Sequence, residues 1–179
     1  MHKLLRFVTI FGLLLASGLF AAACALVGVG GGGGGGALTL EEFFAELEPL
    51  DDRFEADSNE IDARFDTLSD EEVLDQAPDL LQEQAALISE FMDGLEDLEA
   101  PDEAADLQEQ MVSAGRRVVD SFEAALSEVE DAATLDELFA VFDNDEDFSA
   151  AIERFDEVCL DAEALAADND ITIDLNCEE

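Results

Sequence analysis

The sequence is poor in several residue types that carry chemistry. Among 179 residues there is no tryptophan or tyrosine, and the single histidine and single lysine are His2 and Lys3, at the N-terminus. Without histidine, the rest of the chain has no imidazole base, no Ser-His-Asp triad and no histidine metal ligand. Without lysine, it cannot form a Schiff base with a substrate. We therefore expect a protein that is not an enzyme.

Positive charge is also scarce beyond the N-terminus. From Cys24 onward, five arginines stand against 47 acidic residues, a balance of −42. Nucleic-acid binding is not expected, because phosphate contacts need a basic patch. Anionic lipid headgroups would repel this part of the chain, so charge does not hold it at a membrane. The acidity also leads to the hypothesis of salt adaptation, since a Debye length of about 3 Å in molar salt would relieve the self-repulsion.

The N-terminus has the layout of a secretory signal. A basic start, an uninterrupted apolar stretch over residues 7–20 and three alanines lead to Cys24. The stretch FAAAC, residues 20–24, resembles the lipobox of bacterial lipoproteins, with Ala21 where that family usually has leucine. The resemblance implies that residues 1–23 are removed as a signal peptide. It also implies that Cys24 becomes a lipid-bearing N-terminus on the cell membrane.

Two other interpretations of this segment stay open. Ala21 and Ala23 also form an ordinary cleavage site, which would release a soluble secreted protein. Residues 7–29 are 23 uncharged residues, long enough to remain as a membrane-spanning anchor. All three interpretations place the acidic part outside the cytoplasm, because Lys3 and Arg6 stay inside.

Residues 24–38 are predicted to be a flexible tether. They include seven consecutive glycines, residues 30–36, which have no side chains to pack. A chain of this composition behaves as a flexible coil, with an r.m.s. reach of roughly 20 Å for this length. A phosphate-binding loop is not expected, because no strand precedes the glycines and no Gly-Lys-Ser/Thr ending follows them.

Apolar residues in the acidic part recur every three or four positions, which is the spacing of amphipathic helices. Thr39 with Glu42, and Ser69 with Glu72, match the capping boxes that begin helices. Pro78 is expected to separate a short helical piece from a longer one. The spacing predicts four apolar stripes, which cover residues 43–68, 80–98, 107–129 and 138–165.

Four long amphipathic segments with short connections predict antiparallel neighbours. We therefore expect residues 39–179 to form one all-α domain, an antiparallel up-down-up-down four-helix bundle with its acidic side chains outside. The sequence DNDED, residues 143–147, is expected to interrupt the fourth helix. About 140 residues suffice to form a single core. A minor alternative is that part of an apolar stripe forms a groove for a partner helix.

The tail alternates isoleucine and leucine with polar residues over residues 170–176, which predicts a short extended segment packed on the bundle. If Cys24 carries lipid, Cys159 and Cys177 remain as an even pair. Outside the cytoplasm such a pair usually oxidises. We expect a disulfide that holds the tail against the last helix and contributes roughly 3 kcal/mol.

Two acidic stretches resemble calcium-binding loops. DNDEDFSAAIER begins at Asp143 and has Arg154 at its twelfth place, and both stretches lack the glycine that an EF-hand needs at the sixth. Helix boundaries explain both stretches, and calcium binding by the second is the alternative. That second stretch, DNDITIDLNCEE, offers the oxygen ligands Asp168, Asp170, Asp174 and Glu179.

The arginines are expected to form ion pairs with helix neighbours such as Asp120 or Glu157. The helical body and the tail are similar to uncharacterised small helical lipoproteins of bacteria, a resemblance that implies no activity. We expect a lipid-anchored protein of the cell envelope, outside the cytoplasm, with a non-enzymatic binding or structural role. Its expected partners are another envelope protein or a cationic surface, and a calcium- or cation-binding envelope module is the alternative.

Overall fold

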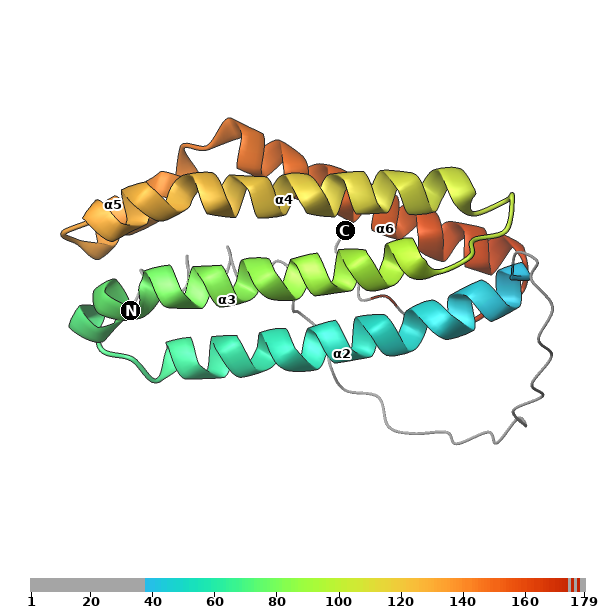
Figure 1. Ribbon diagram of the computed structural model, residues 1–179, viewed down its shortest axis with the longest axis horizontal. Helices are drawn as coiled ribbons and strands as arrows, with labels where there is room; N and C mark the ends of the chain where they lie inside the picture. The colour runs from blue at the N-terminus through green and yellow to red at the C-terminus, as the bar shows by residue number, and fades with distance from the viewer. Residues whose placement is uncertain (1–37, 174, 176, 178–179) are drawn as a thin grey trace.

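The computed structural model describes residues 38–173, together with Leu175 and Cys177. All regular secondary structure in these residues is helical, as the sequence predicted. Figure 1 shows the long helices lying side by side, with a shorter helix at one end of the molecule. The helices are α2 (Leu40–Asp66), α3 (Asp70–Asp97), α4 (Ala105–Asp131), α5 (Leu135–Asp143) and α6 (Glu146–Asp168).

The predicted capping boxes begin the first two of these helices. The Thr39 hydroxyl accepts the N–H of Glu42, and the Glu42 carboxylate accepts the N–H of Thr39 at 2.9 Å. Ser69 and Glu72 form the same pair of bonds at the start of α3. These bonds satisfy amide groups that have no partner inside the helix. The pKa of Glu42 is lowered by the N–H and hydroxyl of Thr39, and the pKa of Glu72 by the hydroxyl and N–H of Ser69, because each bond to the carboxylate favours its charged form.

Pro78 does not divide the second helical stretch, so this prediction is wrong. α3 continues through Pro78 without a break. A proline inside a helix leaves one carbonyl without its usual N–H partner. The neighbouring Ala77 and Leu81 are each 1% exposed, however, and we infer that the burial of this face outweighs the lost bond. Pro49 lies inside α2 in the same way.

The fourth helical stretch is interrupted where the sequence predicted. Asn144 and Asp145 separate α5 from α6, and the Asp145 carboxylate accepts the N–H of Phe148 at 2.9 Å as the N-cap of α6. Thr134 caps α5 by accepting the N–H of Glu137 at 3.2 Å. α5 contacts α3, α4 and α6 and so closes one end of the molecule (Figure 1).

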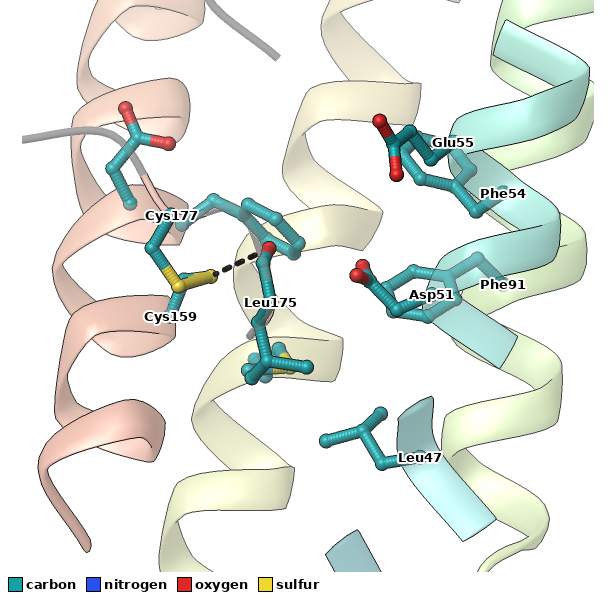
Figure 2. Close-up of a pocket in the computed structure, with 11 residues that line it drawn as sticks. Leu47, Asp51, Phe54, Glu55, Phe91, Cys159, Leu175 and Cys177 are labelled. Atoms are coloured by element: carbon teal, nitrogen blue, oxygen red, sulfur yellow. Dashed lines mark hydrogen bonds between the residues drawn. A yellow bond between two sulfur atoms is a disulfide. The ribbon is translucent and has the colours of Figure 1, made fainter. Parts of the chain in front are cut away.

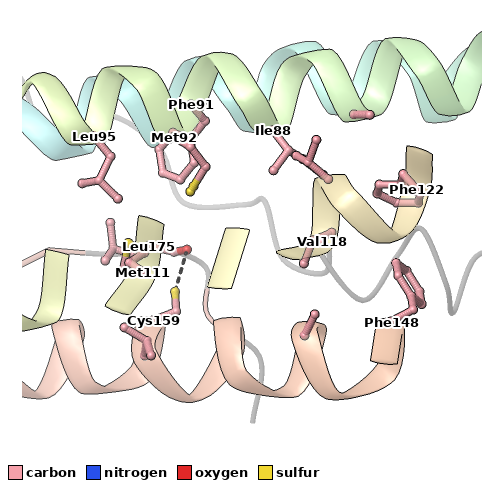
Figure 3. Close-up of a cluster of buried hydrophobic side chains, with 14 of the residues drawn as sticks. Ile88, Phe91, Met92, Leu95, Met111, Val118, Phe122, Phe148, Cys159 and Leu175 are labelled. Carbon is pink, nitrogen blue, oxygen red and sulfur yellow. Dashed lines mark hydrogen bonds between the residues drawn. The ribbon is translucent and has the colours of Figure 1, made fainter. Parts of the chain in front are cut away.

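The centre of the core lies between α3, α4 and α6. Met92 and Leu95 of α3 are both fully buried, and Figure 3 shows them facing Met111 of α4. Towards α5, the rings of Phe122, Phe142 and Phe148 come from three different helices. Their centroids lie 5.3 to 5.9 Å apart in tilted or edge-on arrangements. Each such ring pair contributes about 0.5–1.5 kcal/mol beyond the area it buries, so this cluster ties α4, α5 and α6 together.

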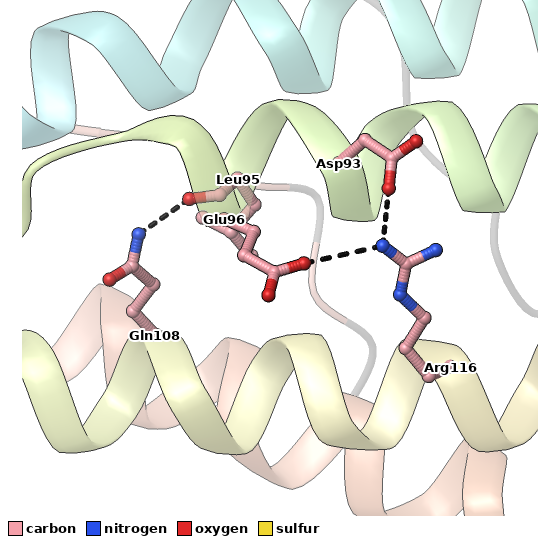
Figure 4. A network of polar contacts seen from close by, with 5 residues as sticks. All are labelled: Asp93, Leu95, Glu96, Gln108 and Arg116. Carbon is pink, nitrogen blue, oxygen red and sulfur yellow. Dashed lines mark hydrogen bonds and ion pairs between the residues drawn. The ribbon is translucent and has the colours of Figure 1, made fainter.

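Ion pairs join the helices on the outside. Three arginines bridge α3 to a neighbouring helix. One of them is Arg116, which faces α3, so the sequence prediction of Asp120 as a partner is wrong for this arginine (Figure 4). The Asp93 carboxylate, with Glu96, raises the pKa of the Arg116 guanidinium. All the pairs are partly exposed, so each contributes at most about 1 kcal/mol. The pairs are Arg53 with Asp57 and Glu90, Arg64 with Glu83, Arg116 with Asp93 and Glu96, and, as predicted, Arg154 with Glu157.

A glutamine from α4 closes the C-terminal end of α3. Gln108 Nε2 donates to the carbonyl oxygen of Leu95 at 2.5 Å (Figure 4) and to that of Leu98 at 2.9 Å. The last carbonyls of a helix have no partner within it. Gln108 therefore fixes the start of α4 against the end of α3.

Candidate functional site

The long helices α2 and α6 make few contacts with each other. α3 packs against α2 and α4, and α4 packs against α6, whereas α2 and α6 approach each other at few positions. The tail fills one part of the gap between α2 and α6. Leu175 is buried there, and its N–H donates to the Glu163 carboxylate of α6 at 3.0 Å.

A disulfide holds the tail in this position. Cys159 of α6 and Cys177 of the tail are joined with their Cα atoms 5.6 Å apart, and they are the pair that the sequence singles out. The sulfur of Cys159 lies 3.8 Å from the carbonyl oxygen of Leu175. Figure 2 shows Leu175 between this disulfide and Leu47 of α2. The tail therefore forms one closed end of the gap.

Beside the tail, the gap stays open as a groove, which we call the α2–α6 groove (Figure 2). Its space, including the open mouth, is about 570 Å³. The rings of Phe54 and Phe91 stack with centroids 5.2 Å apart. Phe54 and Phe155 are half-buried, so the apolar floor is partly open to water. The groove is lined by the rings of Phe54, Phe91 and Phe155, which we call its floor, and by the acidic residues Asp51, Glu55 and Asp156.

A second cavity continues the same floor along the helices. It shares the three phenylalanines and adds Ile152 of α6 and Gly115 of α4. No charged residue of the described chain lines this cavity. On α2 the groove extends from Leu47 to Glu55, which corresponds to roughly 12 Å, or about two helical turns. The floor is therefore elongated and runs parallel to the helices.

The electrostatics of the groove are negative. Asp51 and Glu55 stand one turn apart on α2 (Figure 2), and Asp156 of α6 lines the same groove. Within the described chain, no basic residue lines the groove. Among the described residues that line the groove, no nucleophile stands beside a base.

The predicted calcium ligands are only partly visible. Asp168 is the last residue of α6, and Asp170 follows it in an exposed turn with φ of 59°. Asp174 and Glu179 lie outside the described residues, so the proposed ligand set stays a prediction. Among the residues that the structure describes, no three acidic, cysteine or histidine side chains are grouped to hold a metal ion.

The predicted N-terminal features lie outside the described residues as well. These are the signal peptide over residues 1–23, the lipid-bearing Cys24 and the tether up to residue 37. In the part of the chain that is described, no helix is sufficiently long and apolar to cross a membrane.

Sequence reasoning missed a buried polar contact between α2 and α3. Ser58 and Gln84 are 0% and 2% exposed, and Gln84 Nε2 donates to Ser58 Oγ at 3.2 Å. The other amide atom, Gln84 Oε1, has no partner among the described residues. Both residues stand at positions of the helical repeat that otherwise carry apolar side chains. A polar residue at such a position was the sequence signal that could have indicated the buried contact.

One turn along α2 from Ser58, Asp62 is half-buried. Burial raises the pKa of its carboxyl group to about 6, and the charge of Asp66 adds to this effect. Asp62 is thus an acidic side chain for which the folded state disfavours the charge. The sequence alone gave no sign of this, because acidic residues surround it on the helix.

Comparison of the chain with protein-family models, with curated proteins and with solved structures finds no match in any of the three.

Proposed function

We propose that the protein is a lipid-anchored, extracytoplasmic helical protein with a non-enzymatic binding role. In this proposal Cys24 carries the lipid, and the glycine-rich residues 24–38 tether the body to the cell membrane. The four long helices form an antiparallel up-down-up-down bundle that presents an acidic surface. The partner is a basic protein or another cationic surface of the cell envelope.

The observation that carries the binding role is the excess of unbalanced negative charge. The balance from Cys24 onward is −42. Four of the five arginines in this part are already engaged with carboxylates within the fold. Such a field attracts positively charged partners and repels anionic lipid headgroups, so it favours binding to a basic partner over adsorption to the bilayer. Attachment to the membrane then depends on the lipid.

The test is crosslinking in native membranes, followed by purification of the chain and mass spectrometry of the captured partners. We expect a chain that begins at Cys24 with the mass of attached acyl groups, crosslinked to a protein with a basic surface. The Cys24→Ser variant is the matched control, because it loses the acceptor sulfur and keeps the whole acidic body. An unmodified Cys24, or the same membrane retention in the variant, would refute the anchor. Crosslinks to acidic proteins alone would refute the proposed partner.

A further inference from the structure

We infer that the tail is a redox-sensitive strap. Reduction of the disulfide between Cys159 and Cys177 by a dithiol releases the tail from α6 and uncovers the apolar side chains beneath Leu175. The helices stay packed when the tail leaves. All the groups involved lie in the helical body and its tail, so the inference depends neither on the lipid anchor nor on the basic partner.

Few contacts other than the disulfide hold the tail in place. Among the described tail residues, only Leu175 is buried, and its N–H donates to the Glu163 carboxylate at 3.0 Å. Ile171 and Ile173 are half-buried. The described residues after Asp170 belong to no helix or strand, so no regular ladder of backbone hydrogen bonds adds to these contacts. The disulfide is therefore the strongest link between the tail and α6.

Charge acts against the attachment of the tail. Residues 168–179 include five acidic side chains and no basic one. Asp170 lines a surface hollow together with Glu41 and Glu48 of α2. Like charges at close range repel each other, and the repulsion is strongest at low salt. The disulfide therefore holds the tail against a repulsion that favours its separation from the body once the bond is broken.

Leu175 covers side chains that are buried while the disulfide is intact. Leu47 of α2 and Met111 of α4 are 1% and 4% exposed, and they line the α2–α6 groove together with Leu175 and Cys159. Figure 2 shows Leu175 between the disulfide and Leu47, and Figure 3 shows it beside Met111. Because α2 and α6 make few contacts with each other, neither helix takes the place of Leu175 when the tail leaves. Release therefore extends the water-exposed apolar surface of the groove.

The packing of the helices does not depend on the disulfide. The bond joins α6 to a tail that follows 18 residues later, and it connects no helix to another helix. The apolar core extends through all five described helices. α2 is also joined to α3 by the ion pairs of Arg53 with Glu90 and of Arg64 with Glu83. Breaking the disulfide therefore frees the tail and leaves the helices together.

The chemistry is thiol–disulfide exchange with a dithiol. Cys177 is half-buried and lines the open groove, so its sulfur is the accessible one, whereas Cys159 is 7% exposed. One thiolate of the dithiol attacks Cys177 Sγ, and Cys159 leaves as a thiolate that takes up a proton. The second thiolate of the dithiol attacks its own sulfur in the mixed disulfide, and Cys177 leaves and takes up a proton. The two protons and two electrons come from the dithiol, which becomes a disulfide itself.

The experiment uses the full oxidised chain and dithiothreitol as the dithiol. Amide hydrogen exchange, read by mass spectrometry, follows the N–H of Leu175, and the amides of α4 around Val118 are the internal reference. We expect reduction to speed exchange at Leu175 by at least about tenfold and to change the reference by less than about twofold. Circular dichroism of the reduced chain checks that the helices remain.

Two single variants give the reduced form without a reductant. Cys177→Ser leaves the Cys159 thiol, and Cys159→Ser leaves the Cys177 thiol. With the tail released, we expect iodoacetamide to alkylate Cys159 in the first variant less than about tenfold more slowly than Cys177 in the second. A larger difference would mean that Leu175 still covers Cys159. Cys24→Ser keeps the disulfide and is the matched control, which we expect to respond to dithiothreitol as the wild-type chain does.

Three results would overturn the inference. Unchanged exchange at Leu175 after reduction would show that the apolar contacts alone hold the tail. Exchange that accelerates equally in α4 would show that the disulfide holds the whole fold. A disulfide that dithiothreitol reduces only in urea would show that the folded chain shields it. If a cysteine variant does not fold, the reduced wild-type chain decides, because hydrogen exchange and alkylation are measured on it in the same way.

Discussion

At the scale of single residues, Asp62 weakens the fold at neutral pH. Its pKa is raised from the ordinary 3.8 to about 6, so in this interval the folded state binds more protons than the unfolded state. Stability is therefore lost as pH rises from 3.8 to about 6 and stays lower above that. Because the side chain is half-exposed, we discount the effect to about 1 kcal/mol.

We predict that Asp62→Asn raises the free energy of unfolding by about 1 kcal/mol near pH 7 and by almost nothing near pH 3. Urea unfolding of the variant and the wild type across this pH range, in molar sodium chloride, measures the difference. Asp52→Asn, an exposed change on the same helix, is the control for the loss of one charge. If the gain in the free energy of unfolding did not depend on pH, or if Asp52→Asn gave the same gain, burial of the Asp62 carboxyl group would not be its cause.

The buried contact between Ser58 and Gln84 belongs to the same scale. We predict that Ser58→Ala destabilises the protein by about 1–3 kcal/mol, because it leaves the Gln84 amide without its partner in an apolar interface. Replacing both residues, with Ser58→Ala and Gln84→Met, is expected to be close to neutral, since no buried polar group then remains. Urea unfolding of the two single variants and the double variant tests this. A double variant as unstable as Ser58→Ala would contradict it.

At the scale of elements, the approach of α3 to α4 depends on Gly115. A Cβ atom added there would overlap the sulfur of Met92, so this 0% exposed side chain would have to shift within the core. We predict that Gly115→Ala costs about 1–3 kcal/mol, although alanine favours helices by about 1 kcal/mol over glycine.

Gly94 of α3 is the matched control, because a Cβ atom there would lie 3.2 Å from the end of the half-buried Leu50 side chain. Gly94→Ala is expected to be neutral or to stabilise by up to about 1 kcal/mol. Thermal unfolding compares the two variants. In a Met92→Ala background, Gly115→Ala should lose its cost through coupling of the two sites. If that cost persisted there, the overlap with Met92 would not be its cause.

The elements also show what the sequence can predict. The helix starts at Thr39 and Ser69 could be predicted because a capping box is a local pattern, and the break between α5 and α6 could be predicted for the same reason. The continuity of α3 through Pro78 could not, because it depends on burial by other helices. The partner of Arg116 is on another helix, and local spacing carries no information on that contact.

The candidate site was even less predictable. The apolar spacing identified Phe54, Phe91 and Phe155 as members of helical stripes and left open whether any of them formed a groove. Their meeting depends on the order in which the helices pack and on the position of the tail. The acidic residues that line the groove could not be singled out, because carboxylates occur all along the sequence.

At the scale of the whole molecule, the fold holds an apolar core together against strong self-repulsion. The core extends through all five described helices, while the acidic side chains lie mostly outside it. The repulsion depends on ionic strength, because the Debye length falls from about 30 Å at 0.01 M salt to about 3 Å at 1 M. The hydrophobic contribution has no comparable dependence on screening, so added salt should act mainly through charge.

The balance of core and charge is tested most directly by the melting temperature of the full chain, followed by far-ultraviolet circular dichroism during a sodium chloride titration. We predict a helical spectrum with a cooperative melt, and a melting temperature that climbs strongly from low salt to molar salt. A coil-like spectrum in molar salt would contradict the packed core. A melting temperature that did not respond to salt would contradict the claim that repulsion between the acidic side chains destabilises the fold.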